Sequence, residues 1–397
     1  MKRAGHAVRT PDRSTDRPAA SPPWRPASRP RPRRVLITGG AGFVGTNLAH
    51  RMLASGSSVR VFDNLSRAGV GSNLAWLEAR HPRRLEVQIG HVRDPEAVRR
   101  AVDGVDAVFH FAAQVAVTAS LLEPRHDFEV NAQGALNLLE AVRRFKKPPS
   151  VVFTPTNKVY GDLADVALLE EGSRYLPFDR LVRGRGIGEG RPLSFQSPYG
   201  CSKGTADQYV LDYSRSFSVP ALVFRMSSIY GPHQLGTEDQ GWIAHFLTRA
   251  IEDEPLTIYG DGKQVRDVLF VEDLVDAFRL ALDNIDHLAG QAFNIGGGPA
   301  NSLSLIELLE DIEAIHGQRP RVRYNAWRPG DQRYYVSDIR KFQSLTGWSA
   351  STSVHDGLVS LYRWLVDDRA EPPSRRGAIA PALSGASSEE SARAARS

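Results

Sequence analysis

The chain alternates short apolar runs with longer stretches in which apolar residues recur every three or four positions. Short runs of β-branched and aliphatic residues predict buried strands, and the longer periodic stretches predict amphipathic helices. Strand and helix follow each other repeatedly, which is typical of a parallel sheet covered by helices on both faces. We expect strands at residues 35–38, 59–63, 85–89, 107–113, 151–154, 221–227 and 292–296.

This alternation is interrupted in two places. Residues 233–256 and 297–368 contain helical patterns, such as SLIELLEDIEAIH, with intervening loops. Because ligands of open α/β sheets bind at the carboxyl ends of the strands, we expect these segments to form a smaller substrate-binding lobe there. The predicted fold class is α/β: a Rossmann-type doubly wound parallel sheet, built from 34–232 and 257–296, with this C-terminal lobe.

Both ends of the chain differ from the rest in composition. Residues 1–33 and 369–397 are rich in Pro, Arg, Ser and Ala, so they cannot bury enough apolar surface to offset their chain entropy, and we expect disordered tails. A targeting peptide and a start codon assigned too far upstream are the alternatives for the first tail. Its frequent prolines oppose the amphipathic helix of a targeting peptide.

Charge and composition narrow the class of protein. The formal net charge is +5, but residues 1–34 alone hold ten Lys/Arg against two Asp, which leaves the stretch between the tails acidic. We therefore expect no nucleic-acid partner. No apolar run approaches the roughly 20 residues that span a bilayer, so we expect no membrane segment and a cytoplasmic location. The histidines and the single cysteine, Cys201, show no metal-ligand spacing, and no disulfide is possible within the chain.

A glycine-rich segment, TGGAGFVG (38–45), directly follows the first predicted strand and opens a helix. Gly39 permits a tight turn, Gly42 lets the backbone approach a pyrophosphate, and Gly45 allows close packing of helix on strand. Asp63 ends the next strand, where a carboxylate accepts from the adenosine ribose hydroxyls and repels a 2′-phosphate. The pattern predicts an NAD site.

The segment SPYGCSKG (197–204) predicts a catalytic pair. Ser197 is a good N-cap and Pro198 a good first helical residue, so Tyr199 and Lys203 share one helix face. Two cations, the ammonium and an oxidised nicotinamide, would favour the phenolate, which makes Tyr199 a general base. Alone, the two residues could be ordinary helix positions, but the glycine loop favours catalysis.

TGxxGxxG followed by YxxxK resembles the short-chain dehydrogenase/reductase superfamily, and the C-terminal lobe resembles its extended branch of nucleotide-sugar epimerases and dehydratases. The resemblance implies a third catalytic hydroxyl at Thr156, in VVFTPTNKVYGD. It also implies that Gln114 and Ser120 face nicotinamide or sugar, and that Asn131 is the structural Asn of the cofactor site. The further cofactor contacts that it implies are Phe43, Val44, Asn64, His91, Val92, Ala112 and Ala113.

The residues after Thr156 distinguish between branches of this family. In the 4,6-dehydratases, TDE supplies an acid and a base for eliminating water, whereas this chain has Asn157 and Lys158. TNKVYGD, SPYGCSKG, DQGW and GDGKQVRDVLF resemble the CDP-paratose 2-epimerases, also called CDP-tyvelose 2-epimerases. The long separation between Thr156 and Tyr199 fits as well, and we expect its LVRGRGIGEGRP segment (181–192) to be a mobile flap or a surface excursion.

The resemblance also implies the substrate and its contacts. Arg266 and Arg333 would hold the pyrophosphate of a sugar nucleotide; exposed arginines are the alternative. Asn157 and Ser228 would also contact the substrate. The expected function is inversion of C2 of a CDP-hexose through a transient 2-keto sugar, by a homodimer or homotetramer. A nucleotide-sugar 4-epimerase or other sugar-nucleotide oxidoreductase, and a non-catalytic NAD-binding protein, remain the alternatives.

Three positions depart from the pattern of the family. His91 follows Gly90 where the family has an Asp that accepts from the adenine amino group. Thr154 and Pro155 replace two serines before the catalytic Thr, and Met226 replaces a histidine. The first departure alters the adenine contact, and the other two affect sugar preference.

Overall fold

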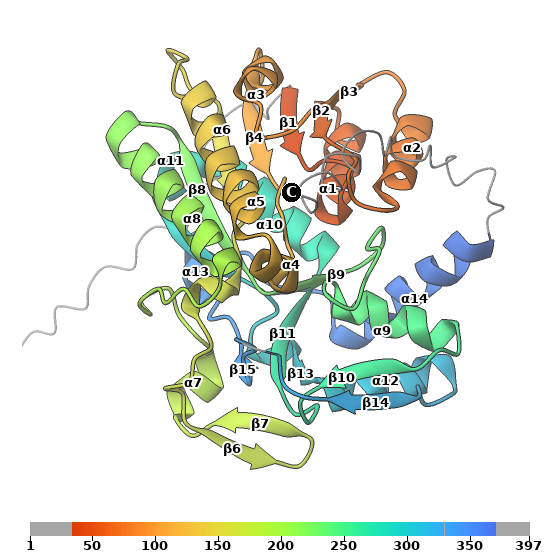
Figure 1. Cartoon of the computed structure of the whole chain (residues 1–397). Coiled ribbons are helices and arrows are strands. Elements are labelled where there is room, and N and C mark those ends of the chain that lie inside the picture. The colour runs from red at the N-terminus through yellow and green to blue at the C-terminus, as the bar shows by residue number, and fades with distance from the viewer. Residues whose placement is uncertain (1–33, 329, 371–397) are drawn as a thin grey trace, which may run out of the picture.

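The centre of the molecule is a seven-stranded sheet in which every neighbouring pair is parallel, in the order β3-β2-β1-β4-β5-β8-β12 (Figure 1). The computed structural model describes residues 34–328 and 330–370, so the predicted tails lie outside the described residues apart from 369–370, which end the last helix. All seven predicted strands are present. They are β1 (Arg34–Thr38), β2 (Ser58–Asp63), β3 (Leu85–Ile89), β4 (Ala107–His110), β5 (Ser150–Phe153), β8 (Ala221–Met226) and β12 (Ala292–Ile295).

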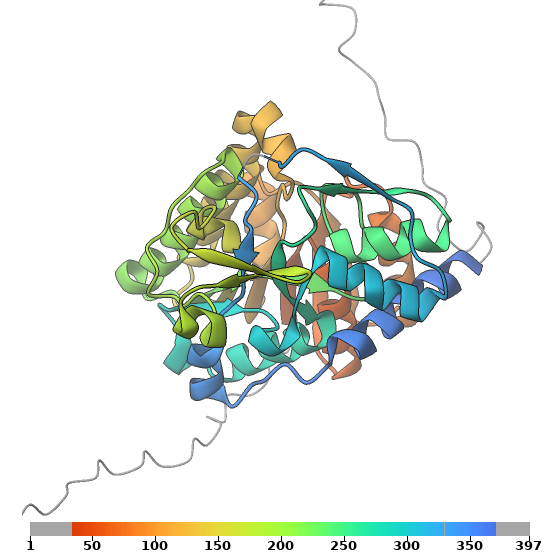
Figure 2. The ribbon, with the colours of Figure 1, turned by 90° about the horizontal axis from the view of Figure 1, so that it is seen from below.

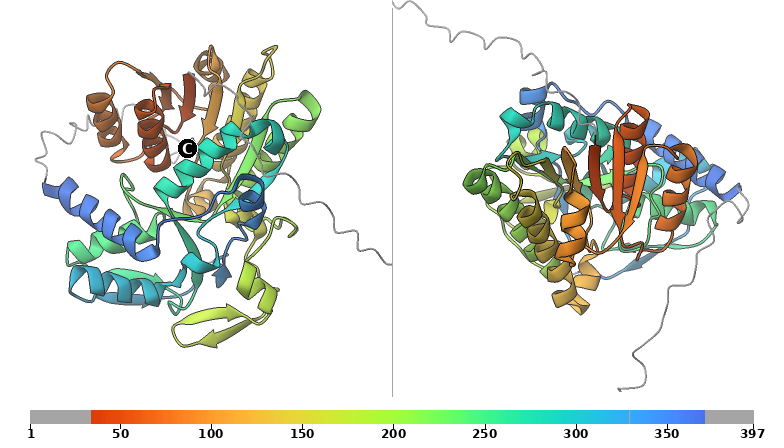
Figure 3. Two further views of the ribbon diagram at one scale, coloured as in Figure 1. Left: turned by 180° about the vertical axis from the view of Figure 1, so that it is seen from behind. Right: turned by 90° about the horizontal axis from the view of Figure 1, so that it is seen from above.

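Helices cover both faces of this sheet, as the view from above makes plain (Figure 3). Alternate residues of β1 enter different cores: Val35 and Ile37 face one layer of helices and Leu36 faces the other. The first layer contains α1 (Phe43–Ala54), α2 (Val70–Arg80), α10 (Val271–Asp283), α11 (Ile285–Leu288) and α13 (Arg340–Thr346). The second contains α3 (Pro95–Val102), α6 (Gly134–Val142) and α8 (Pro198–Phe217), with α4 (Val117–Leu122), α5 (Pro124–Phe128) and the π-helical turn η1 (Glu129–Gln133) beside α8. The predicted Rossmann-type fold is confirmed.

A second group of elements forms a lobe with its own apolar core, below the sheet in Figure 1 and nearest the viewer in Figure 2. One of its sheets contains β9 (Ser228–Tyr230), β11 (Val265–Phe270), β13 (Ser302–Ser304) and β15 (Tyr334–Tyr335); the other pairs β10 (Leu256–Tyr259) with β14 (Val322–Asn325). Its helices are α9 (Trp242–Ile251), α12 (Leu305–His316) and α14 (Val354–Ala370). The expected domain boundaries stay a prediction, but β10 and β11 pair in these sheets and not in the seven-stranded one.

Part of the long segment between Thr156 and Tyr199 is buried against the rest of the protein. It contains the 3-10 turn η2 (Asn157–Tyr160), the hairpin of β6 (Leu168–Glu171) and β7 (Arg174–Pro177), and α7 (Arg180–Arg185); the other 3-10 turn, η3 (Pro299–Asn301), precedes β13. Ile187 is buried: its N–H donates to Val336 O at 2.7 Å, and its carbonyl accepts from Asn294 Nδ2 at 2.7 Å and from Asp338 N at 2.9 Å. A surface excursion is therefore the wrong description for Ile187.

Candidate active site

A cavity of about 810 Å³ lies at the carboxyl ends of the strands. Its wall is made by the loop between β1 and α1, the segments that follow β2 to β5, the first turn of α8, and residues 226–243. Of the residues predicted from the sequence, those that line it are Gly39, Gly42, Phe43, Val44, Gly45, Asp63, Asn64, His91, Val92, Ala112, Ala113, Gln114, Thr156, Tyr199, Lys203 and Ser228. Segments far apart in the chain thus meet at one site.

The glycine loop has the geometry that a pyrophosphate site requires. Gly39 has φ +69°, and a Cβ there would lie 2.7 Å from Ala112 N. A Cβ on Gly45 would lie 2.3 Å from Gly39 O, so only glycine lets α1 pack this close to the loop. The helix begins at Phe43, and its N-terminus borders the cavity. A helix N-terminus favours anions, so the diphosphate of a dinucleotide fits here.

Asp63 stands at the end of β2 with its carboxylate held by backbone amides. Oδ2 accepts from Ala41 N at 3.1 Å and Oδ1 accepts from Leu65 N at 2.9 Å. Burial raises the pKa of Asp63, while these hydrogen bonds and the guanidinium of Arg67 oppose the change. Arg67, which also lines the cavity, is a residue that the sequence reasoning missed.

The catalytic trio predicted from the sequence is brought together at the start of α8. Ser197 Oγ accepts from Gly200 N at 3.1 Å and Pro198 is the first helical residue, so the predicted helix start is confirmed. Tyr199 and Lys203 are both buried and both line the cavity. Thr156 is joined to the Tyr199 side chain by a hydrogen bond. The phenol of Tyr199 and the hydroxyl of Thr156 are therefore joined, and Lys203 lies one helical turn further along α8 in the same cavity wall.

Burial dominates the electrostatics of this trio. It raises the pKa of Tyr199 to about 12, although the hydrogen bond with Thr156 lowers it. It lowers the pKa of Lys203 to about 8, although the carboxylate of Asp127 raises it. Lys203 Nζ donates to Thr154 O at 3.3 Å. The phenol is thus neutral at pH 7 in the protein alone, and Lys203 by itself does not produce the phenolate.

Asp127 is a buried carboxylate behind the trio. It accepts from Ser202 Oγ at 2.5 Å and from Asn131 Nδ2 at 3.1 Å. Asn131 lies in the π-helical turn η1, and its Oδ1 accepts from Gln114 N at 3.0 Å. Asn131 therefore braces the segment after β4 from behind the cavity wall. The sequence reasoning missed Asp127 because no motif surrounds it.

Five of the predicted site residues do not line the cavity: Ser120, Asn131, Asn157, Arg266 and Arg333. Ser120 is fully buried; its Oγ accepts from Tyr199 N at 3.2 Å and donates to Val117 O at 2.7 Å. The hydroxyl of Ser120 thus positions the backbone of Tyr199. For all five residues, the substrate and cofactor contacts expected from the sequence remain predictions.

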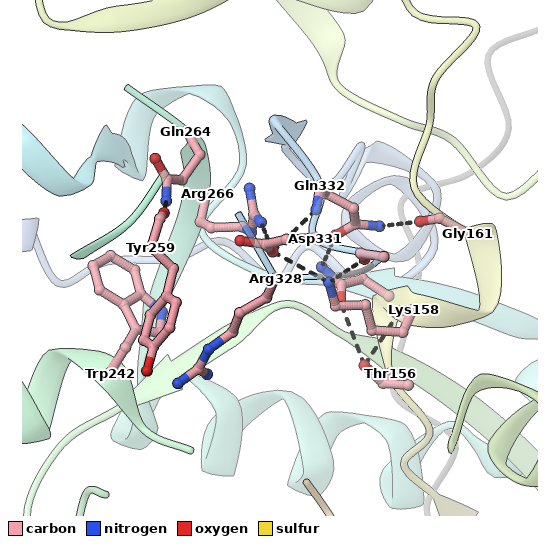
Figure 4. A network of polar contacts seen from close by, with 12 residues as sticks. Thr156, Lys158, Gly161, Trp242, Tyr259, Gln264, Arg266, Arg328, Asp331 and Gln332 are labelled. Atoms are coloured by element: carbon pink, nitrogen blue, oxygen red, sulfur yellow. Dashed lines mark hydrogen bonds and ion pairs between the residues drawn. The ribbon is translucent and has the colours of Figure 1, made fainter. Parts of the chain in front are cut away.

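Arg266 belongs to the ion-pair network beside Thr156 that Figure 4 shows. Arg266 and Lys158 both approach Asp331 Oδ1, at 2.8 Å and 3.5 Å. Burial lowers the pKa of Lys158 to about 8, whereas Asp331 raises it. Burial also raises the pKa of Asp331, but Arg266 and Lys158 outweigh burial and hold it below its usual value. One carboxylate is therefore shared by two cations, which leaves this cluster of three side chains with a net positive charge.

Asn157 is hydrogen-bonded to the same region, whereas the guanidinium of Arg333 has other partners. Asn157 Nδ2 donates to Gln332 Oε1 at 3.4 Å. The guanidinium of Arg333 lies over the rings of Trp327 and Tyr175, 5.2 Å and 5.7 Å from their centres. The two arginines expected to act together thus have different partners.

The side of the cavity formed by the lobe contains further residues that the reasoning from sequence missed. Trp242 lines the cavity and its Nε1 donates to Ser228 Oγ at 3.3 Å. Arg328 lies 3.9 Å from the ring centre of Tyr259 (Figure 4). It also forms an ion pair with cavity-lining Asp239 at 3.4 Å. Trp242 could have been predicted from the sequence, because it is the last residue of the motif DQGW. Two departures from the family pattern, Pro155 and Met226, also line this cavity.

Within residues 34–328 and 330–370, no group of three or more His, Cys, Asp or Glu side chains is placed to hold a metal ion. None of the helices described there is long and apolar enough to cross a membrane.

A glycine loop, a carboxylate at the end of β2 and a buried Tyr–Lys pair in one cavity are the features of an NAD-dependent enzyme. Residues 35–296 match the NAD-dependent epimerase/dehydratase family, and the chain belongs to this family. CDP-paratose 2-epimerase from Salmonella typhi is 44% identical over 338 residues, which is 83% of this chain and 98% of that protein.

Solved structures agree with this assignment. UDP-glucose 4-epimerase from Thermus thermophilus, in complex with NAD, has a TM-score of 0.69 and 30% identity, over 84% of this chain and 99% of that one. dTDP-glucose 4,6-dehydratase from Streptomyces venezuelae, with NAD bound, has a TM-score of 0.73 and 30% identity, over 85% and 98%. The predicted family, fold class, enzyme class and NAD cofactor are confirmed.

Proposed function

We propose that the enzyme inverts C2 of a CDP-hexose, in the manner of a CDP-paratose 2-epimerase, with NAD as a cofactor that is regenerated in each turnover. The choice of C2 and of a CDP-sugar rests on the relative that is 44% identical, and the observation that favours epimerisation over dehydration is the pair of residues after Thr156. Asn157 and Lys158 stand where elimination of water needs an acid and a base. The relative that is 44% identical points to the same reaction.

The contacts of Lys158 support epimerisation over dehydration. Its Nζ donates to Gly330 O at 3.2 Å and approaches Asp331 Oδ1 at 3.5 Å. Because two oxygens hold this ammonium, Lys158 is not free to act as a base on the substrate. The carboxamide of Asn157 can donate hydrogen bonds, but it is not an acid that could protonate a leaving hydroxyl. The site therefore lacks, at these two positions, the groups that a 4,6-dehydratase uses.

The proposed chemistry uses the trio at the start of α8. Bound NAD would accept a hydride from the sugar carbon and return it to the opposite face. Tyr199 would take the proton of the sugar hydroxyl and later give it back, while Thr156 holds the same oxygen. Lys203 would stabilise the phenolate, which burial otherwise opposes by raising the pKa of Tyr199 to about 12.

The remaining predicted contacts are proposed with the same site. The glycine loop and Asp63 would hold the pyrophosphate and the ribose of NAD. Ser228 would contact the sugar from the side of the cavity that Trp242 covers. Arg266 would bind the substrate pyrophosphate after exchanging its ion pair with Asp331 for a phosphate.

Proton NMR of sugar nucleotides tests the function. CDP-paratose, CDP-glucose and UDP-glucose are each incubated with purified protein without added cofactor, beside Tyr199→Phe as the matched inactive control. Inversion at C2 of a CDP-sugar, without net NADH, is the expected result. Inversion at C4 would replace the proposal with the 4-epimerase. No change in any of the three sugars would count against epimerisation and favour a non-catalytic NAD-binding protein.

We also propose a cytoplasmic homodimer formed through α4, α5 and α8, which lie side by side. Their exposed apolar side chains include Leu121, Leu122, Phe128 and Tyr209; Leu122 is 83% exposed. Burying such residues favours association. Light scattering should give a dimer for the wild type and a monomer for Leu122→Asp, and cell fractionation tests the location.

A further inference from the structure

Asp127 is a buried carboxylate that lies against the helix of the catalytic pair. It belongs to α5, which packs against α8, and its side chain is fully enclosed. Its Oδ2 accepts from Ser202 Oγ at 2.5 Å, and Ser202 directly precedes Lys203. Taking a carboxylate out of water costs free energy, so the groups around Asp127 must stabilise it.

The hydrogen bonds around Asp127 show that it is ionised. A backbone N–H can only donate, so Asn131 Oδ1 accepts from Gln114 N and Asn131 Nδ2 is the group that faces Asp127. This Nδ2 donates to Asp127 Oδ1 and to Ser202 Oγ, each at 3.1 Å. Ser202 has one proton, and Asp127 Oδ2 at 2.5 Å is a nearer acceptor than Tyr199 O at 3.1 Å. Asp127 thus accepts at both oxygens, as a carboxylate anion does.

The negative charge of Asp127 acts on Lys203. Lys203 Nζ donates to Thr154 O at 3.3 Å and lies 5.2 Å from the centre of the Phe153 ring, and neither of these neighbours is charged. Burial lowers the pKa of Lys203, and Asp127 opposes this change. His110 also lies near the ammonium, but burial and Lys203 lower its pKa to about 3, so it is neutral at pH 7. The charge of Lys203 therefore depends on Asp127.

The same negative charge has the opposite consequence for the phenol. Burial raises the pKa of Tyr199 to about 12, and Asp127 adds to this increase. Burial raises the pKa of Asp127 itself, while the Ser202 hydrogen bond and Lys203 oppose the change. His126, which lines the cavity, opposes it as well. Removing the charge of Asp127 should thus lower the pKa of both Lys203 and Tyr199.

We propose that Asp127 is a positioning residue of the reaction: its buried charge keeps Lys203 protonated at neutral pH and thereby fixes the pH range in which Tyr199 and Lys203 work together. The inference rests on the proposed roles of these two residues in turnover. Asp127 does not line the cavity, so it acts on the reaction through Lys203 and not by touching the sugar.

Carbon-13 NMR of the lysine side chains tests the electrostatic step without any sugar. The chain has seven lysines, so each Cε resonance can be followed against pH in the full chain, and Lys203 is the resonance that Lys203→Met removes. We expect Lys203 to titrate near pH 8 in the wild type, and about one pH unit lower or more in Asp127→Asn. A difference below about 0.3 of a pH unit would overturn the inference. Asp127→Ser, which also removes the charge, serves if Asp127→Asn does not fold.

Three controls separate the charge of Asp127 from its packing. Lys158 is an internal control, because it belongs to another cluster and its own titration near pH 8 should not change. Ser202→Ala removes a hydrogen bond of Asp127 but keeps the charge, so Lys203 should titrate as in the wild type. Asp212→Asn removes the same charge from an exposed position of α8 and should also leave Lys203 unchanged. If Ser202→Ala lowered the titration as much as Asp127→Asn, packing would be the cause and the inference would be wrong.

The pH dependence of kcat, measured by NMR of the sugar nucleotides, tests the consequence for turnover. Because the pKa values of both partners fall, the pH optimum of Asp127→Asn should lie about one pH unit below that of the wild type. A merely structural defect would lower kcat at every pH and leave the optimum in place, and that result would overturn the inference. If the wild type turned over none of the sugars, the proposed function would be wrong, whereas the lysine titration would still decide the electrostatic step.

Discussion

Replacing Lys203 with Met should abolish turnover and yet stabilise the protein. The ammonium of Lys203 is buried, and burial lowers its pKa from 10.5 to about 8. At about 1.4 kcal/mol for each tenfold change in proton affinity, this difference corresponds to about 3 kcal/mol of unfolding free energy at pH 7. Met has nearly the same length and carries no charge, so Lys203→Met removes this cost.

Part of the gain is offset by lost contacts. Lys203 Nζ donates to Thr154 O at 3.3 Å, and losing a hydrogen bond of this kind costs about 1 kcal/mol. The ammonium also lies 5.2 Å from the centre of the Phe153 ring, a contact worth up to about 1 kcal/mol. Asp127 keeps its hydrogen bonds to Ser202 and Asn131 but loses the nearby ammonium that lowers its pKa. We therefore expect a net stabilisation of about 1 to 2 kcal/mol.

The stability advantage of Lys203→Met over the wild type should depend on pH. The unfolded chain holds this proton up to about pH 10.5, whereas the folded protein releases it above about pH 8. The cost in the wild type is thus fully present below pH 8 and disappears as the pH rises towards 10.5. The advantage of Lys203→Met should follow the same course.

Urea denaturation at pH 7 and at pH 10, followed by circular dichroism, measures both quantities. The exposed Lys146 supplies the control, because Lys146→Met removes a charge that is already in water. Equal or lower stability of Lys203→Met at pH 7, or an advantage that is the same at both pH values, would refute the argument that burial of this ammonium is costly.

Three further substitutions have definite expected results. Tyr199→Phe should keep NAD bound and lower kcat by about 10² to 10⁴, measured by NMR turnover and by the absorbance of bound cofactor; unchanged turnover would remove Tyr199 from the mechanism. Gly45→Ala should lose NAD affinity in calorimetry, because its Cβ would come within 2.3 Å of a backbone oxygen, whereas Gly71→Ala, with open space around it, should bind normally. Asp207→Asn should cost about 3 to 5 kcal/mol in urea denaturation, since it leaves the buried guanidinium of Arg225 without its bidentate partner at 2.8 Å and 3.0 Å; a loss below 1 kcal/mol would contradict this.

Most of the central sheet could be predicted from the sequence because strands such as β1, β4 and β5 are buried on both faces and appear as apolar runs. The edge strand β3 is partly exposed, and its run LEVQI contains Glu86 and Gln88. The strands of the lobe had no such signal. Those at 302–304 and 334–335 have three and two residues, and only their pairing with β11 makes them strands. Tertiary contacts therefore decide their structure.

In the active site, too, the parts with a local sequence pattern could be predicted, and the parts that depend on distant residues could not. The glycine loop and the start of α8 are local structures, since each depends on residues within one turn of a helix. Asp127 and Asp331 act on Lys203 and Lys158 across long sequence separations, so no local pattern identifies them. Arg333 was expected at the substrate from its place in a motif, but its guanidinium lies over two aromatic rings.

The buried position of Ile187 also sets an order of events during synthesis. Two of its backbone partners, Val336 and Asp338, leave the ribosome about 150 residues after Ile187 does. At roughly 5 to 20 residues per second, the segment around Ile187 waits on the order of 10 to 30 seconds for them. Throughout that interval an apolar side chain and two backbone groups stay exposed to chaperones, so the inserted segment is among the last parts of the nascent protein to be closed.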